Sequence, residues 1–290
     1  MKRITFVLLV FMPLLAISQR DWSQVEIPVT EIAPGVHRLF VANSVAVVMF
    51  HGTDGVLVVD AAYEQSADRL LEEIRKIDSR PITYLINTHL HGDHTGGNVL
   101  LGKEAQIIAH PSVKDALSQE QRRGDNIIPP MPEHAIPQIF VDDNMDLEFN
   151  GEVIQITHLP GGHTRGDLIV YLPYAGVLVM GDLLFAGYFP FVDVSNGGNP
   201  IVFLENVARV LAHFPAETIV VGGHGPVFSM DDLRNWHQQL NNTLEVMKLA
   251  KQNGMTAEQM KTARVLKDWE AMGSFFITED RWIDTLYPFL

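Results

Sequence analysis

The chain of 290 residues contains no cysteine. No disulfide can therefore form, and no thiolate can bind a metal ion, so a metal site would need nitrogen and oxygen ligands. A lipid-modified cysteine, one means of anchoring an exported chain to a membrane, is excluded as well. The absence of disulfides by itself neither supports nor opposes export.

Basic residues are also few. The sequence has 21 Lys and Arg against 35 Asp and Glu, a formal net charge of −14. A surface of that sign repels phosphate backbones, so we expect no nucleic-acid partner and a small-molecule substrate instead. The composition, 47% hydrophobic and 19% charged, is otherwise that of an ordinary globular protein.

The N-terminal apolar run, Phe6 to Ile17, is shorter than the roughly 20 residues that a membrane-spanning helix needs. Lys2 and Arg3 precede this run, and Ala16-Ile17-Ser18 places small residues where signal peptidase cuts. We therefore predict a cleaved signal peptide over residues 1–18, a periplasmic or secreted location, and no stable membrane anchor after cleavage. An uncleaved membrane anchor is the alternative.

A dense cluster of metal-binding residue types follows the buried strand predicted at Pro81 to Asn87. In an extended chain, His89, His91 and Asp93 project from one side, and His94 begins the turn away from them. Imidazoles and a carboxylate without a thiolate suit zinc or iron, and such a cluster can reach two neighbouring ions. The alternative is a histidine-rich loop that is merely exposed.

The order of these residues, His-x-His-x-Asp-His from His89 to His94, resembles the signature of the metallo-β-lactamase superfamily. The ligands of that family arrive in a fixed order on separate loops: this cluster, then a single histidine, an aspartate and a last histidine. His163, Asp182 and His224 follow predicted strands in that order. The resemblance covers roughly residues 36–228.

The resemblance implies an α/β fold, the four-layer αβ/βα metallo-β-lactamase sandwich. We expect this domain to span residues 19–228, with residues 229–290 forming helices packed on it as a C-terminal appendage. The pattern of apolar residues predicts the following elements. Strands are expected at 36–41, 45–50, 56–60, 81–87, 106–109, 138–141, 145–149, 153–158, 167–172, 177–180 and 218–221, and helices at 65–77, 98–103, 112–122, 201–214, 230–253, 256–266 and 279–287, with a polar lead-in at 21–34.

The resemblance also implies two zinc ions, with iron and manganese as alternatives, and a hydroxide that bridges them. His158 is the competitor for the role of His163, and Asp182 could instead cap a following helix. Asp93 and Asp182 are the expected catalytic carboxylates. The implied ligands are His89, His91 and His163 for the first ion, Asp93, His94 and His224 for the second, and Asp182 between both.

The implied chemistry is hydrolysis at the acyl carbon of an ester, thioester or lactam. The segment His163 to Pro173 resembles β-lactamases of the first subclass. However, Asp182 stands where that subclass has a cysteine, and Phe185 where it has a lysine that pairs with the carboxylate of the drug. The aspartate instead resembles glyoxalase II and related thioesterases and lactonases. A dedicated β-lactamase, a diiron redox enzyme and a non-catalytic metal binder are the alternatives.

Two segments near the expected site have two interpretations each. Residues 124–137 contain four prolines together with Ile127, Ile128 and Met131, and form either a substrate-covering lid or a loop packed on the domain. The run Phe185 to Phe191 carries four aromatic residues, which either line an apolar substrate pocket or belong to the core.

Overall fold

The computed structural model describes residues 21–123 and 126–290, so the predicted signal peptide at 1–18 lies outside the described residues. Within the described part, no helix is long and apolar enough to cross a membrane. The side chains of residues 121–126 are not described.

The strands form one continuous sheet that is folded into two halves, and a short hairpin stands apart from it. Strand pairing joins the halves at a single residue pair, His224 with Val45. The strands of the sheet and hairpin are β1 (Val29–Ala33), β2 (Val36–Val41), β3 (Val45–Gly52), β4 (Gly55–Val59), β5 (Ile82–Ile86), β6 (Gln106–Ala109), β7 (Gln121–Arg123), β8 (Asn126–Ile128), β9 (Ile139–Phe140), β10 (Asn144–Phe149), β11 (Glu152–His158), β12 (Leu168–Leu172), β13 (Val177–Phe185), β14 (Ile219–His224) and β15 (Phe228–Ser229).

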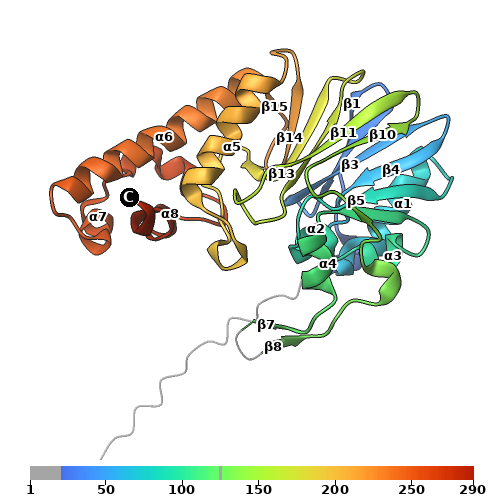
Figure 1. Cartoon of the computed structure of the whole chain (residues 1–290), viewed down its shortest axis with the longest axis horizontal. Helices are drawn as coiled ribbons and strands as arrows, with labels where there is room; N and C mark the ends of the chain where they lie inside the picture. Colours follow the sequence, from blue (N-terminus) through green and yellow to red (C-terminus); the bar gives the residue numbers. More distant parts are fainter. Residues whose placement is uncertain (1–20, 124–125) are drawn as a thin grey trace, which may run out of the picture.

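Helices cover the outer face of each half, on opposite sides of the molecule (Figure 1). The helices α1 to α4 belong to the first half of the chain, and α5 to α8 to the second. Their bounds are α1 (Ala67–Ile77), α2 (Gly92–Thr95), α3 (Asn98–Leu101), α4 (Pro111–Leu117), α5 (Pro200–His213), α6 (Met230–Gln252), α7 (Ala257–Ala263) and α8 (Glu279–Leu286).

Strand alternation separates the core into layers, because successive side chains point to opposite faces of a sheet. In β3, Val47 and Met49 pack with Leu70 of α1, whereas Val48 packs with Ile154 of the other half. In β13, residues 177 and 179 face the first half, and residues 178 and 180 face α5 and α6. The order is therefore helices, sheet, sheet, helices, and the predicted four-layer αβ/βα sandwich is confirmed.

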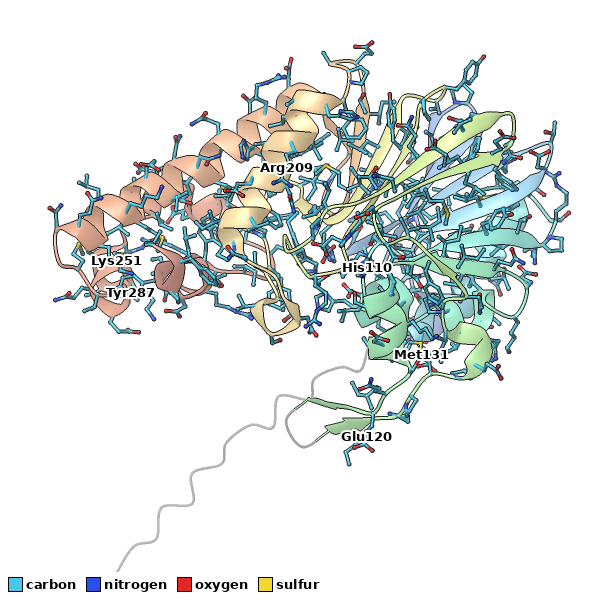
Figure 2. All side chains as sticks on the ribbon, viewed as in Figure 1. His110, Glu120, Met131, Arg209, Lys251 and Tyr287 are labelled. Carbon is cyan, nitrogen blue, oxygen red and sulfur yellow. The ribbon has the colours of Figure 1, made fainter. Side chains whose placement is uncertain are left out.

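The C-terminal appendage packs on the second half of the sheet (Figure 1). The helix α6 starts with a capping box, in which Ser229 and Asp232 each satisfy the other's backbone N–H. The helix ends at Gln252, and Gly254 beyond it has φ +85°, a conformation that glycine adopts without steric cost. Near the C-terminus, the Lys251 ammonium lies 4.4 Å from the centre of the Tyr287 ring (Figure 2).

Five expected elements differ from the observed ones by three residues or more. The helix predicted at 256–266 ends at Ala263, because Arg264 adopts a left-handed conformation. The predicted lead-in contains β1, an edge strand that pairs with β2. The helix predicted at 112–122 ends at Leu117, and residues 121–123 pair with 126–128 as the hairpin β7–β8. The strand predicted at 177–180 continues to Phe185, because β13 keeps its pairing with β14 across two irregularities in register. The strand predicted at 218–221 likewise continues to His224.

Replacing Trp282 by alanine is expected to lower the free energy of unfolding by about 3–5 kcal/mol, because a fully buried aromatic side chain would leave a cavity. Trp282 of α8 is 0% exposed, its indole N–H donates to Thr243 Oγ1 at 2.9 Å, and its ring stacks on Phe189. Urea unfolding measures the change. The control Leu249→Ala, at a 61% exposed position, should change it by under about 0.5 kcal/mol. Equal effects would contradict the packing described.

Candidate metal centre

The candidate metal centre lies where several strands end or bend at one edge of the sandwich. The strand β5 ends at Ile86, and the next residues lead to His89, His91 and the short helix α2, which carries Asp93 and His94. His224 is the last residue of β14, and Asp182 lies within the neighbouring parallel strand β13. The carboxyl ends of parallel strands meet at one edge, so the fold itself gathers these side chains.

Three imidazole nitrogens of the first group point at one another. His91 Nδ1 lies 3.1 Å from His89 Nε2 and 2.9 Å from His163 Nε2. Together with an oxygen of Asp182, these atoms lie within 4.8 Å of one another. His89 and His163 are at most 1% exposed.

The outward nitrogen of each of these histidines meets a hydrogen-bond acceptor. His91 Nε2 lies 2.9 Å from Asp193 Oδ2, and His163 Nδ1 lies 2.8 Å from the carbonyl oxygen of Phe191. His89 Nδ1 lies 3.0 Å from Thr88 Oγ1, whose own proton goes to Asp60 Oδ2. Because each outward nitrogen donates its proton, each inward nitrogen is left with its lone pair, the arrangement found in metal-binding histidines.

The second group is built in the same way. Asp93, His94 and His224 form a further set of three whose donor atoms lie within 4.8 Å of one another. His94 Nδ1 donates to Asp60 Oδ2 at 2.8 Å, and His224 Nδ1 donates to the carbonyl oxygen of Ser44 at 2.8 Å. Asp93 Oδ2 lies 3.5 Å from the inward nitrogen of His224.

Asp182 stands between the two groups, and its two carboxylate oxygens face different ones. Oδ2 lies 3.4 Å from His163 Nε2, and Oδ1 lies 3.1 Å from His94 Nε2 and 3.4 Å from His224 Nε2. Gly223 makes this closeness feasible, because a Cβ there would lie 2.0 Å from Asp182 Oδ1. Gly223 is thus required by the approach of Asp182, whereas a Cβ at Gly222 would lie 2.3 Å from the carbonyl oxygen of Leu184.

The buried nitrogen and oxygen atoms of this site are suited to bind metal ions. His94 Nε2 and Asp182 Oδ1 are buried, and neither has an aligned hydrogen-bond partner among the described residues. Buried polar atoms without a partner are costly. Lone pairs that converge without a proton between them repel one another, and a cation removes that repulsion. Imidazole and carboxylate ligands without thiolate are those that zinc and iron accept.

Without a metal ion, the pKa values of His89 and His163 are shifted down and those of His94 and His224 are shifted up. Burial lowers the pKa of His163 to about 4 and that of His89 well below its usual value. Burial opposes the charge on His94 too, but the Asp182, Asp60 and Asp93 carboxylates together raise its pKa well above the usual value. In the same way Asp182 outweighs burial and raises the pKa of His224. Protons in the second group therefore occupy the place of a cation.

The pKa values of the buried carboxyl groups of Asp182 and Asp167 shift in opposite directions. Burial would raise the pKa of Asp182, but His224, His94 and His89 hold it well below the usual range. Asp167 differs, because burial raises its pKa to about 7 in spite of hydrogen bonds from the backbone and hydroxyl of Thr164. This carboxyl also accepts the backbone N–H of His163 at 2.7 Å and so fixes the loop that carries it.

All seven residues expected from the sequence come together in this site. His158, the competitor of His163, instead makes contacts to the carbonyl oxygens of Asp142 and Arg165 and stacks on His110. Asp182 caps no helix, because β13 continues through it. That the seven residues are metal ligands stays a prediction.

Sequence analysis did not identify Asp60 and Asp193, the carboxylates that accept protons from His94 and His91. Asp60 has φ +64°, a conformation that residues other than glycine rarely adopt, and accepts three hydrogen bonds. A sequence signal existed for Asp60, which ends the apolar run Val56 to Val59 just as the ligand loops follow other strands. No comparable signal marks Asp193, which lies in an irregular loop.

The segments 124–137 and 185–191 each lie partly beside the candidate metal centre and partly against the core. Of the aromatic residues after Asp182, Phe185 and Phe191 line the cavity beside the site, whereas Phe189 is 0% exposed in the core. In the proline-rich segment, Ala135 is buried and its carbonyl oxygen accepts from Asn98 Nδ2, so that end is packed. Its other end lines the cavity through Ile128 and Met131.

Residues 37–224 match the family model described as the metallo-beta-lactamase superfamily. The chain belongs to this superfamily. It is 27% identical over 165 residues to a metallo-beta-lactamase type 2 of Bacteroides fragilis, covering 57% of this chain and 61% of that one. It is 29% identical over 147 residues to a hydroxyacylglutathione hydrolase of Erythrobacter litoralis, covering 49% of each chain. The chain thus spans about half to three fifths of these relatives.

A solved metallo-beta-lactamase from Pontibacter korlensis superimposes with a TM-score of 0.61 at 18% identity, covering 75% of this chain and all of the other. At that identity the likeness shows the fold alone. The protein is therefore a member of a metallo-hydrolase superfamily with a cluster of residues suited to metal binding.

Binding of Zn²⁺ at pH 7 is expected to release at least one proton, because His94 is protonated in the metal-free protein and must be neutral as a ligand. Zinc affinity should accordingly rise about tenfold per pH unit for each proton displaced, until the pH exceeds the pKa of His94. Isothermal titration calorimetry in two buffers of different ionisation enthalpy counts the protons. The His94→Asn variant should release fewer, and identical heats in both buffers would contradict this account.

Proposed function

We propose that the protein is an exported dinuclear zinc hydrolase that attacks the acyl carbon of an ester, thioester or lactam. The observation that carries the proposal is the position of Asp182, whose two oxygens face two separate histidine groups. A carboxylate in that position suits two ions. His89, His91 and His163 would hold one, Asp93, His94 and His224 the other, and Asp182 would contact both.

Bound zinc would polarise a carbonyl and supply hydroxide from water at neutral pH. The chain's own residues prepare the site for this chemistry. Asp193 and Asp60 keep the imidazoles of His91 and His94 in one tautomer by accepting their outward protons. Asp93 is 26% exposed and lines the cavity, where a carboxylate oxygen can accept a proton from the attacking water.

A dedicated β-lactamase is the principal alternative, and the relative from Bacteroides fragilis favours it. The residues beside the site favour it less. Phe185 is 2% exposed and stacks on His224 with ring centres 4.9 Å apart, so no ammonium group stands there to pair with the carboxylate of a drug. A charge-assisted contact of that kind typically contributes about 1.5–3 kcal/mol.

The variants His91→Ala and Asp93→Ala are expected to lower kcat/KM for any substrate of the zinc-loaded protein by at least about 100-fold, because each removes a metal-site ligand. Hydrolysis of an ester panel, a thioester and a cephalosporin measures the loss. The control His213→Ala changes an exposed histidine away from the site and should keep full activity.

Other outcomes of this experiment distinguish the alternatives. Full activity in either variant would contradict the proposed site. Zinc bound without turnover of any substrate would indicate a metal binder, and iron with an optical band would indicate redox chemistry. Efficient turnover of the cephalosporin alone would indicate a dedicated β-lactamase.

The proposal of export is supported by Lys2, Arg3 and the apolar run that follows them. Expression in a bacterium with an intact export pathway should yield a periplasmic or secreted protein whose N-terminus is Gln19, and mass spectrometry of the intact chain measures this. A chain that keeps residues 1–18 and stays with the membrane fraction would instead be anchored.

A further inference from the structure

The candidate metal centre opens into a cavity of about 1280 Å³. Ligand pockets are typically about 300–1,000 Å³, so this space can take a substrate with a substantial group beside the scissile bond. His91, Asp93, Asp182 and His224 all contribute to its lining.

One side of the cavity is an aromatic wall, formed by Phe185, Phe191, Phe275 and Phe276. The wall touches both halves of the metal centre. Phe191 lies 5.7 Å between ring centres from His91, and Phe275 lies 5.5 Å from His224. Phe276 meets Phe191 edge-on at 5.6 Å. An apolar group lying against this wall would therefore be next to the reacting centre.

The outer part of the wall comes from the C-terminal appendage, beyond the residues that match the superfamily. Phe275 and Phe276 are 37% and 50% exposed, although Met272 before them and Ile277 after them are buried. The backbone carbonyl oxygen of Met272 accepts from Phe189 N–H at 2.9 Å, which fixes the segment on the core. Two adjacent phenylalanines are thus displayed toward the cavity on an anchored segment, and such exposed apolar groups are typical of binding sites.

Further apolar residues, Leu90, Ile128 and Met131, line the cavity apart from the aromatic wall. Met131 lies below α4, close to the hairpin β7–β8 (Figure 2). Its backbone N–H donates to the carbonyl oxygen of Leu117 at 2.9 Å, and its side chain packs on the cluster of Leu90 and Val113. The cavity therefore has apolar surface besides the aromatic wall.

The charges of the cavity select against an anionic substrate. None of its described lining residues is Lys or Arg, whereas Glu64, Glu120 and Asp193 are acidic, as are the metal-site residues Asp93 and Asp182. Away from the metal centre, the charged side chains that line the cavity are acidic, so a carboxylate or sulfate there would meet negative charge. The guanidinium of Arg281 lies 4.8 Å from the centre of the Phe276 ring, but Arg281 is not part of the lining. An uncharged apolar group would be accommodated on the wall.

We propose, on the basis of the hydrolase function above, that the substrate is an uncharged alkyl or aryl carboxylic ester whose acyl group lies on the aromatic wall. Phe275 and Phe276 are its specificity-determining residues. Water adds its oxygen to the acyl carbon, the bond from that carbon to the alkoxy oxygen breaks, and the alkoxide takes one proton of the water. The acid ionises at neutral pH, so the acidic cavity favours its release.

The test compares kcat/KM of the zinc-loaded protein for ethyl acetate, ethyl hexanoate and monoethyl adipate. Hydrolysis is measured through the proton that the product acid releases. The adipate matches the hexanoate in length but carries a charge at its end. We expect kcat/KM for the hexanoate to exceed that for the acetate by at least about tenfold, since each added methylene in an apolar pocket contributes about that factor or more. It should exceed that for the adipate by about tenfold as well, because the terminal carboxylate of the adipate would meet the acidic lining of the cavity. Equal values for the hexanoate and adipate would overturn the proposal.

The double variant Phe275→Ala/Phe276→Ala should lower kcat/KM for the hexanoate about tenfold or more and change that for the acetate less than twofold. The double leucine variant should keep most of the preference, because it keeps apolar surface. Phe140→Ala is the matched control, an exposed phenylalanine (37%) also approached by a cation, Lys114, but outside the cavity. An equal loss on both esters would mean that the two rings serve the fold only, and would overturn the proposal.

Binding to the metal-free protein separates this proposal from the proposed function. Saturation-transfer NMR with intact ethyl hexanoate should show binding that the double alanine variant loses and Phe140→Ala keeps. If the metal-free protein binds the ester but the zinc-loaded protein hydrolyses none, the proposed hydrolase function would be contradicted. The aromatic wall would then be an apolar binding site only. Hydrolysis without chain-length preference, together with unchanged binding in the double variant, would contradict the role of the aromatic wall in specificity. The proposed hydrolase function would then still hold.

Discussion

The structure depends on the convergence of five imidazole nitrogens and two carboxylates in a small buried space. When these rings are neutral, each inward nitrogen carries a lone pair, because the outward nitrogen of the same ring gives its proton to a fixed acceptor, such as Asp60, Asp193 or the carbonyl oxygen of Ser44. Such an arrangement is unfavourable by itself, because lone pairs and carboxylates in low dielectric repel one another. A cation makes it favourable, and in its absence protons on His94 and His224 take part of that role.

The fold supplies this convergence through parts that are distant in sequence. Strand pairing joins the two halves of the sheet at His224 and Val45, so the last residue of the candidate metal centre also links the halves. The aromatic residues that follow Asp182 link the site to the appendage, because Phe185 faces His224 while Phe189 stacks on Trp282 of α8. The C-terminal appendage, which follows the residues that match the superfamily, thus reaches the cavity through Phe275 and Phe276 and helps to shape it.

The apolar pattern of the sequence predicted most strands and helices, whereas the four layers and the seven residues of the candidate metal centre were predicted from the family resemblance that the motif from His89 to His94 carries. Sequence analysis could not predict that β13 extends through Asp182, since that strand is held by its pairing with β14 and by a glycine next to Thr88. Asp193 and the pair Phe275–Phe276 were also beyond reach. Their roles depend on tertiary contacts across long sequence separations, which no local pattern records.

The most direct test of the account is anomalous diffraction at the zinc absorption edge from crystals of the zinc-loaded protein. We expect two peaks, one surrounded by His89, His91 and His163 and the other by His94, His224 and Asp93, with a carboxylate oxygen of Asp182 facing each. A single peak, or peaks away from these residues, would contradict the claim that the two groups of side chains are built around two metal ions.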